Sequence, residues 1–331
     1  MATPAAGGVA AATEFSLIDR IRARCIGRDD VVLGIGDDGA LLQPPAGQQL
    51  VVSTDTLVAG VHFPEDTAPA DIGWKALAVN LSDLAAMAAQ PAWCTLALTL
   101  PGGDAAWLDG FLDGFLDLAA RHDIALVGGD TTRGPLAVTV TVMGFVPAGQ
   151  ALRRDAARVG DEIWVTGTLG DAAAALRQWQ VGVGMDADLR RRLDRPTPRI
   201  DVGLALRGLA AAGIDLSDGL LADLGHVLKA SGVGAELQLA ALPTSAALHA
   251  LQHDDQARWP LQLSGGDDYE LCFTAPPAHH DAIVAALSKV GPAAQVIGRI
   301  VAGSDLALYR ADGNRWQADA KGYQHFVERN A

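Results

Sequence analysis

Residues 71–89 read DIGWKALAVNLSDLAAMAA, an alanine-rich stretch with one carboxylate, Asp83, within its apolar part. Alanine and leucine favour a long helix, and Asp71 is suited to cap its first turn by accepting from free backbone amides. In helical projection Asp83 lies between leucines, with Asn80 beside it. A carboxylate in apolar surroundings costs free energy unless it is paired or binds a metal. The stretch therefore predicts a packed helix that carries an acid with a partner.

Strand-like segments lie on both sides of this helix. Residues 50–58, LVVSTDTLV, are rich in β-branched residues, and residues 93–100 form a second such run. Alanine-rich helices that alternate with runs of valine, isoleucine and leucine favour helices layered on sheet, and so an α/β (α+β) fold. The same patterns predict helices at 14–24, 105–121, 171–180, 200–212, 219–230 and 278–290, and strands at 124–127, 136–146, 162–166, 214–216, 235–239, 269–274, 294–300 and 306–309.

Length and a change of composition indicate two domains. The chain has 331 residues, which is long for one domain, and 50% of them are hydrophobic. Residues 147–160 contain glycines and several arginines, which predicts a boundary there. A second basic connection, residues 190–199, contains proline and is expected to be exposed. We therefore expect a disordered tail at 1–13, an N-terminal domain at 14–148 and a C-terminal domain at 149–331.

The net charge and the cysteines disfavour some partners and some cellular locations. Lys and Arg number 25 and Asp and Glu 39, a formal net charge of −14. This charge disfavours a nucleic-acid partner or an anionic membrane surface, because both need basic residues. Cys25, Cys94 and Cys272 are far apart and form no C-x-x-C pair, which favours a reducing, cytoplasmic location. We expect no signal peptide and no membrane span, since no sufficiently long apolar run occurs.

Aspartates recur beside glycine or hydroxyl residues at six places. Five are expected at loop-like junctions or strand ends and one on the helix; they are Gly34–Asp38, Ser53–Thr56, Asn80–Asp83, Gly128–Thr132, Asp215–Gly219 and Ser264–Asp268. Glycine lets the backbone approach a ligand closely, and carboxylates with hydroxyls are the hard oxygen ligands that Mg²⁺ prefers. Any single Asp-Gly pair is ordinarily a turn, and Asp215 and Asp218 could simply cap the next helix. Six such sites together favour divalent-cation chemistry.

Several common site patterns are excluded. Gly34-x-Gly36-x-x-Gly39 imitates a dinucleotide fingerprint, but its two aspartates would face the pyrophosphate and the prolines after it cannot continue a helix. No phosphate-binding G-x-x-x-x-G-K-[ST] loop and no G-x-S-x-G nucleophile elbow occur, and no histidine pair has the spacing of a zinc site.

Seven motifs in order resemble thiamine-monophosphate kinases, a family in the superfamily of aminoimidazole ribonucleotide synthetase and selenophosphate synthetase. They are EFSLI (14–18), GIGDDGA (34–40), STDTLVAGVHF (53–63), KALAVNLSDLAAM (75–87), GGDTTRGP (128–135), IDLSDGL (214–220) and SGGDDYELCF (264–273). The resemblance runs from about Glu14 to Phe326, nearly the whole chain.

The resemblance implies a two-domain fold in which the N-terminal sheets of two subunits form a barrel across a homodimer, with a C-terminal α/β sandwich. The N-terminal domain would bind ATP and metal. The family's metal-binding positions match Asp38, Ser53, Thr54, Asp55, Asp83, Asp130, Asp215 and Asp218. Its nucleotide contacts match Gly129, Asp130, Arg154 and Ser217, and its acceptor contacts match His62, Asp267 and Tyr323. Asp267 is a departure, because the family usually has the longer glutamate there.

The implied reaction is phosphoryl transfer from ATP to thiamine monophosphate, which gives thiamine diphosphate. An acceptor that is already an anionic phosphate needs no strong base, so we expect no covalent nucleophile but several Mg²⁺ ions, with Asp38, Asp55, Asp130 and Asp218 assisting. Taken alone, Arg154 could equally be an exposed linker arginine, His62 an ordinary loop histidine and Tyr323 a packing residue.

Rival functions make different demands on the sequence. Selenophosphate synthetase would need a reactive cysteine and then a lysine near the N-terminus, but Cys25 is followed by Ile26-Gly27-Arg28. A maturation dehydratase of the superfamily would need a C-terminal cysteine, and this chain ends in Ala331. An aminoimidazole ribonucleotide synthetase would activate an amide oxygen instead. A non-catalytic cation- or nucleotide-binding protein is the rival from another class; ATP consumption with and without thiamine monophosphate distinguishes it.

Overall fold

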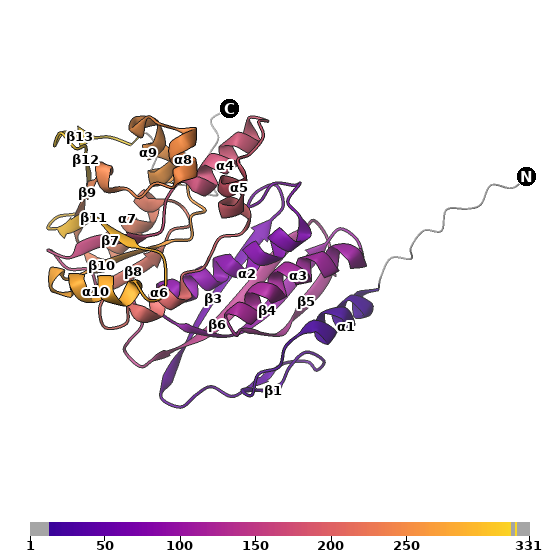
Figure 1. The fold of residues 1–331 in the computed structure, drawn as a ribbon. Helices are drawn as coiled ribbons and strands as arrows, with labels where there is room; N and C mark the ends of the chain where they lie inside the picture. The colour runs from indigo at the N-terminus through magenta and orange to yellow at the C-terminus, as the bar shows by residue number, and fades with distance from the viewer. Residues whose placement is uncertain (1–12, 319–321, 323–331) are drawn as a thin grey trace, which may run out of the picture. The chain divides into compact units, whose positions relative to one another are not determined.

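The computed structural model describes residues 13–318 and Gly322 (Figure 1). The chain divides into two compact units that are not contiguous in sequence. Unit 1 comprises residues 1–43, 54–77 and 93–141, and unit 2 comprises residues 44–53, 78–92 and 142–331. Of the predicted tail, residues 1–12 lie outside the described residues, whereas Thr13 caps the first helix by accepting from the Ser16 amide at 3.4 Å. The domain boundary at 148/149 stays a prediction.

The first half of the chain forms a four-stranded sheet with helices. Its helices are α1 (Glu14–Arg24), α2 (Pro69–Ala86) and α3 (Ala105–Arg121), and its strands are β1 (Val31–Leu33), β2 (Leu41–Leu42), β3 (Gln48–Val58), β4 (Gln90–Leu100), β5 (Ala125–Arg133) and β6 (Ala137–Pro147). The sheet has the order β3-β6-β4-β5, with β4 and β5 parallel, and β1 pairs with β2 separately.

Within unit 1, α3 packs closely against the first half of α2 (Figure 1). A Cβ atom on Gly73 of α2 would lie 2.0 Å from the Phe111 carbonyl oxygen, and one on Gly114 of α3 would lie 1.7 Å from the Ala70 carbonyl oxygen. The two backbones therefore meet at glycines, as in other close helix crossings. α2 begins at Pro69, so the prediction that Asp71 caps it is wrong; Asp71 lies in the first turn, where proline is well suited to start a helix.

The second half of the chain forms a seven-stranded sheet in unit 2, in the order β13-β12-β9-β11-β7-β10-β8. Its strands are β7 (Glu162–Thr166), β8 (Ala212–Asp215), β9 (Gly234–Gln238), β10 (Leu271–Ala275), β11 (Ala294–Val301), β12 (Leu306–Tyr309) and β13 (Arg315–Trp316). Its helices are α4 (Asp171–Gln180), α5 (Ala187–Asp194), α6 (Ile200–Ala205), α7 (Leu220–Ser231), α8 (Ala246–Leu251), α9 (Asp255–Ser264) and α10 (His280–Leu287), with 3₁₀ turns at Leu239–Ala241 and Pro277–His279.

Helices cover both faces of this sheet. Leu224 of α7 and Leu263 of α9 share one apolar cluster with Ile163 and Val165 of β7. Trp164, which points to the other face, lies against the ring of His280 in α10, with centroids 4.8 Å apart. The alternation of β7 side chains between the two faces gives this part of the chain helix, sheet and helix layers.

Three local predictions are wrong. Residues 190–199 are not an exposed connection, because α5 takes up the first half and Arg192 and Arg199 pair with a buried carboxylate described below. The helix predicted at 200–212 ends at Ala205 as α6. The strand predicted at 124–127 continues as β5 to Arg133, so Gly128–Thr132 lies in a strand rather than a loop.

None of the helices in the part of the chain that the structure describes is long and apolar enough to cross a membrane. All three cysteines are free; Cys94 and Cys272 are buried.

Candidate functional site

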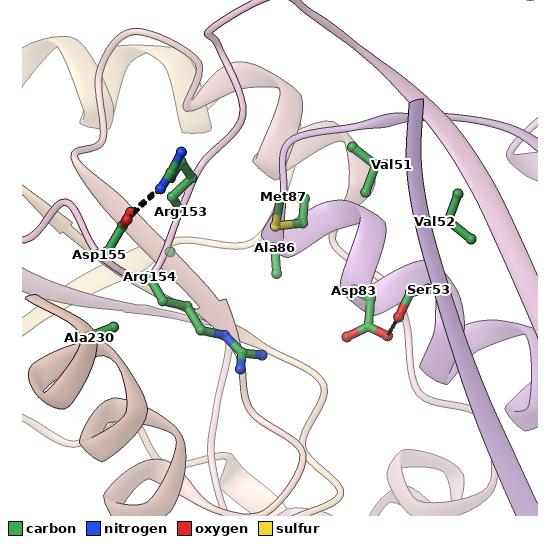
Figure 2. A pocket seen from close by; sticks show the side chains of 11 residues that line it. Val51, Val52, Ser53, Asp83, Ala86, Met87, Arg153, Arg154, Asp155 and Ala230 are labelled. Atoms are coloured by element: carbon green, nitrogen blue, oxygen red, sulfur yellow. Dashed lines mark hydrogen bonds and ion pairs between the residues drawn. The ribbon is translucent and has the colours of Figure 1, made fainter. Parts of the chain in front are cut away.

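A cavity of about 390 Å³ lies within unit 2 (Figure 2). This unit includes the N-terminal part of β3 and the C-terminal end of α2. Its walls are formed by Val51, Val52, Ser53, Asp83, Ala86, Met87, Arg153, Arg154, Asp155, Gly213 and Ala230. One side is therefore acidic and hydroxylic, and the other carries two arginines. A cavity with this lining suits an anionic ligand that also binds a cation.

Asp83 is held at this cavity by a hydroxyl group. The Ser53 Oγ donates to Asp83 Oδ2 at 2.6 Å, and in Figure 2 the other carboxylate oxygen points away from Ser53, on the side of Arg154. Burial raises the pKa of Asp83 above its ordinary value, whereas the Ser53 hydrogen bond and the positive charge of Arg154 act in the opposite direction. The partner that the sequence required for Asp83 is thus Ser53, which was itself a predicted metal ligand.

Arg154 extends from a short segment that is fixed to helix α7. Ser231 Oγ donates to the Arg154 carbonyl at 2.8 Å and accepts from the Ala157 amide at 3.1 Å. The neighbouring Arg153 forms two hydrogen bonds with Asp155, at 2.8 and 2.5 Å. Arg154 is exposed and lies in a loop, with its backbone anchored and its side chain lining the cavity.

A second predicted group follows strand β8 in unit 2. Asp215 is buried at the end of β8, and the next three amides after Leu216 converge on one buried acid. The backbone N–H groups of Ser217, Asp218 and Gly219 donate to Asp223 Oδ2 at 3.0, 3.0 and 3.1 Å. Burial, followed by the charge of Asp218, raises the pKa of Asp223 to about 7, although the three amide bonds act to lower it. The predictions did not include Asp223.

The segment before strand β10 is joined to this same loop. The Asp267 amide donates to the Ser217 carbonyl and the Tyr269 amide to the Leu216 carbonyl, each at 2.8 Å. Asp267 and Tyr269 have positive φ values of 60° and 49°, which non-glycine residues adopt only where the surroundings hold them. The Tyr269 hydroxyl also lies 3.1 Å from Asp267 Oδ1. The structure thus brings the predicted nucleotide contact Ser217 and the predicted acceptor contact Asp267 together.

A buried charge cluster lies directly behind this segment. Glu270 is fully buried and accepts from Thr166 Oγ1 at 2.6 Å, from Arg192 Nη2 at 2.8 Å and from Arg199 Nε at 2.7 Å. Asp268 is also buried and accepts from the Gly170 amide at 2.8 Å; burial raises its pKa well above the ordinary value. The backbone of the 267–270 segment is therefore fixed from its inner side by charged groups.

Unit 1 carries the other predicted residues. Asp38, Asp55 and Asp130 are exposed, and Asp130 lines a small cavity of about 90 Å³ with Gly129 and residues of α1. Gly129 has a φ of 152°, and a Cβ there would lie 1.8 Å from the Leu96 carbonyl oxygen, so only glycine lets β5 approach β4 at this point.

Thr54 and His62 are engaged within unit 1. The Thr54 hydroxyl lies 3.1 Å from the Val140 carbonyl and 2.9 Å from Thr141 Oγ1. His62 Nδ1 accepts from the Val58 amide at 3.0 Å, and the buried Lys75 donates to the His62 carbonyl at 3.0 Å. The His62 turn is therefore fixed by its own backbone and by Lys75, which the predictions also missed.

Tyr323 lies outside the described residues. Among residues 13–318 and Gly322, no three His, Cys, Asp or Glu side chains lie close enough together to form a metal-binding group. Asp83 and Asp223 both accept hydrogen bonds from neutral donors rather than from arginine or lysine side chains. The oxygen atoms of Asp83 and Ser53 suit a hard cation that takes some of its ligands from elsewhere.

Comparison with known proteins defines the family. Residues 36–146 match the family described as AIR synthase related protein, N-terminal domain, and residues 158–310 match the corresponding C-terminal domain. Thiamine-monophosphate kinase of Escherichia coli (strain K12) is 54% identical over 324 residues, which cover 95% of this chain and 98% of that protein. The chain belongs to the thiamine-monophosphate kinase family.

Solved structures of thiamine-monophosphate kinases have the same fold. The enzyme from Stenotrophomonas maltophilia K279a superimposes with a TM-score of 0.84 and 56% identity, covering 92% of this chain and 98% of that one. AaThiL complexed with AMPPCP and TMP superimposes with a TM-score of 0.75 and 31% identity, covering 95% of this chain and 97% of that one. The predicted two-domain α/β fold of this superfamily is thereby confirmed.

Proposed function

We propose that this chain catalyses the ATP-dependent phosphorylation of thiamine monophosphate to thiamine diphosphate, in the cytoplasm. The observation that carries the proposal is the 54% identity to the Escherichia coli enzyme over 95% of the chain. The complex of AaThiL with AMPPCP, an ATP analogue, and TMP supports the same pair of substrates. The enzyme is a phosphotransferase with a phosphate group as acceptor, acting in thiamine diphosphate biosynthesis.

Mg²⁺ is the proposed metal, and the residues present fit it. Mg²⁺ keeps several waters and uses one or two carboxylates with substrate phosphates, so it does not need three protein carboxylates at one point. The proposed ligands in unit 2 are Ser53, Asp83, Asp215 and Asp218, and those in unit 1 are Asp38, Thr54, Asp55 and Asp130. When bound, Mg²⁺ ions neutralise the phosphates and stabilise the charge that develops during transfer.

The protein's own groups bind and orient the two substrates. Arg154, from its anchored segment, would balance the charge of the nucleotide phosphates, and Gly129, Asp130 and Ser217 would contact the nucleotide. His62, Asp267 and Tyr323 would contact thiamine monophosphate, with the anionic Asp267 near the cationic thiazolium. The acceptor phosphate is already a nucleophile, so transfer is direct and in line, and no covalent enzyme intermediate forms.

The proposal also includes the assembly of two subunits. We propose a homodimer in which the N-terminal sheets of two subunits form a barrel. Val52 and Leu50, on β3, have 56% and 48% of their surface exposed, which supports a sheet face that is covered in the dimer.

The test is ATP turnover with and without thiamine monophosphate, with thiamine diphosphate measured by chromatography. We expect ADP and thiamine diphosphate in equal amounts, only when the acceptor and Mg²⁺ are present. Asp55→Asn or Asp130→Asn should abolish transfer without unfolding the protein. Near-normal rates in these variants at low Mg²⁺, or tight ATP binding with no turnover, would refute the proposal.

A further inference from the structure

The loop after β8 is organised by one carboxylate that belongs to no proposed ligand set. Asp223 lies in the first turn of α7 and is 4% exposed. Its Oδ2 atom accepts from three consecutive amides, those of Ser217, Asp218 and Gly219. Three donors on one oxygen fix the direction of three peptide units at once, so the side chains between them have little freedom.

This arrangement occupies the backbone amides that precede the helix. A helix N-terminus with free amides ordinarily attracts anions such as phosphate. Here the amides that precede α7 donate to Asp223, so they are not free to bind a ligand anion. The groups of this loop that are left for a ligand are the side chains of Ser217 and Asp218.

The same loop holds the segment that carries Asp267. The Ser217 and Leu216 carbonyls accept from the Asp267 and Tyr269 amides, both at 2.8 Å. Because the Ser217 amide is fixed by Asp223 and its carbonyl binds the Asp267 amide, one peptide segment connects the buried acid to both proposed substrate contacts. A shift of this loop would therefore displace Asp267 as well.

We propose that Asp223 is the positioning residue that fixes the loop after β8 through the amides of residues 217–219, and so presents the side chains of Ser217 and Asp218 to the metal–nucleotide complex. Asp223 does not touch the substrates; it acts through the backbone of residues 217–219. The identity of the ligand, a metal–nucleotide complex, rests on the proposed kinase function. The hydrogen bonds between Asp223 and the three amides do not depend on that function.

The test compares Asp223→Ala and Asp223→Asn with the wild-type full chain. Hydrogen exchange followed by mass spectrometry reports the amides of residues 217–219, and calorimetry reports the Kd for AMPPCP with Mg²⁺. For Asp223→Ala we expect exchange in this segment to be faster by about tenfold or more and Kd to rise by about tenfold, because three buried hydrogen bonds are lost. Asparagine keeps an acceptor oxygen, so Asp223→Asn should restore both values to within about threefold.

Asp186→Ala is the matched control. Asp186 caps α5 in the same unit, where its side chain accepts from the amides of Asp188 and Leu189 at 2.9 and 3.2 Å. Its loss should accelerate exchange only at α5 and leave the Kd for Mg²⁺–AMPPCP unchanged. Asp223→Ser, too short to reach the amides, replaces Asp223→Ala if the alanine variant does not fold.

The inference is overturned if folded Asp223→Ala or Asp223→Ser shows wild-type exchange at 217–219, or faster exchange with an unchanged Kd. It is equally overturned if Asp223→Asn binds as weakly as the truncated variants. Should the wild-type protein fail to phosphorylate thiamine monophosphate, the proposed function fails, but exchange and AMPPCP binding still decide the role of Asp223.

Discussion

Replacement of Glu270 by glutamine tests whether the buried charge cluster of unit 2 stabilises the fold around the proposed acceptor site. Glu270 is fully buried, and its carboxylate binds both Arg192 and Arg199. Glu270→Gln keeps the shape of the side chain but removes the charge that compensates two largely buried guanidinium groups. The side chains of Arg192 and Arg199 are only 22% and 13% exposed, so water replaces the lost interaction poorly.

The size of the effect follows from this burial. Breaking a buried ion pair by removing one partner costs about 3–5 kcal/mol, because a charge is left uncompensated. For a folding unit of roughly 150–250 residues, 1 kcal/mol corresponds to about 2–4 °C in Tm, so Tm should fall by roughly 6–20 °C. The exposed pair of Asp188 and Arg191 provides the contrast, and Asp188→Asn should change Tm little.

Urea unfolding and calorimetry of Glu270→Gln, Arg199→Met and the double variant measure the effect. We expect the double variant to be less destabilised than the sum of the singles, with a coupling of about 1–3 kcal/mol. A loss of less than about 1 kcal/mol in Glu270→Gln would show that water reaches the cluster and that the reasoning from burial is wrong.

Three further predictions concern single groups. Tyr269→Phe removes the hydroxyl 3.1 Å from Asp267 Oδ1; we expect the KM for thiamine monophosphate to rise about threefold with the KM for ATP unchanged, and an equal rise in both would contradict an orienting role. The hydrogen bond from Arg28 holds the pKa of Asp30 below its ordinary value. Its stabilisation is therefore complete above the ordinary Asp pKa of about 3.9 and is lost as pH falls through the lower pKa of the folded state. The free energy of unfolding of Asp30→Asn in urea should differ from that of the wild type at pH 6 and converge with it near the acid limit, and a constant difference would refute this. Gly129→Ala should destabilise unit 1 by about 1–3 kcal/mol in urea and weaken AMPPCP binding, since its Cβ would collide with the β4 backbone; unchanged stability would show that β5 can move away.

Much of the local structure could be predicted from the sequence. Residues 14–24, 105–121, 162–166 and 171–180 form the predicted elements with the predicted ends. Thr13 and Asp104 are N-cap residues that mark the starts of α1 and α3, and such signals act over three or four neighbours. The resemblance of the seven motifs to the family was also sufficient to identify it.

The exact ends of helices and strands could not be predicted where they pack tightly against a neighbour. Gly128 and Gly129 suggested a loop, yet β5 continues through them because β4 lies close enough to exclude a side chain there. Pro260 lies inside α9, where a sequence pattern alone does not indicate a helix. In both places a neighbour in space overrides the local preference.

The sequence by itself determined many of the longer helices and strands, the acid-rich motifs and the family, because these depend on residue types and on short spacings. Only the tertiary structure decided which charges meet. Arg192 and Arg199 are 78 and 71 residues from Glu270, and Ser217 contacts a segment 50 residues later, so no local pattern connects them. A buried carboxylate such as Glu270 needs donors that only the fold brings to it, since leaving it without partners costs several kcal/mol.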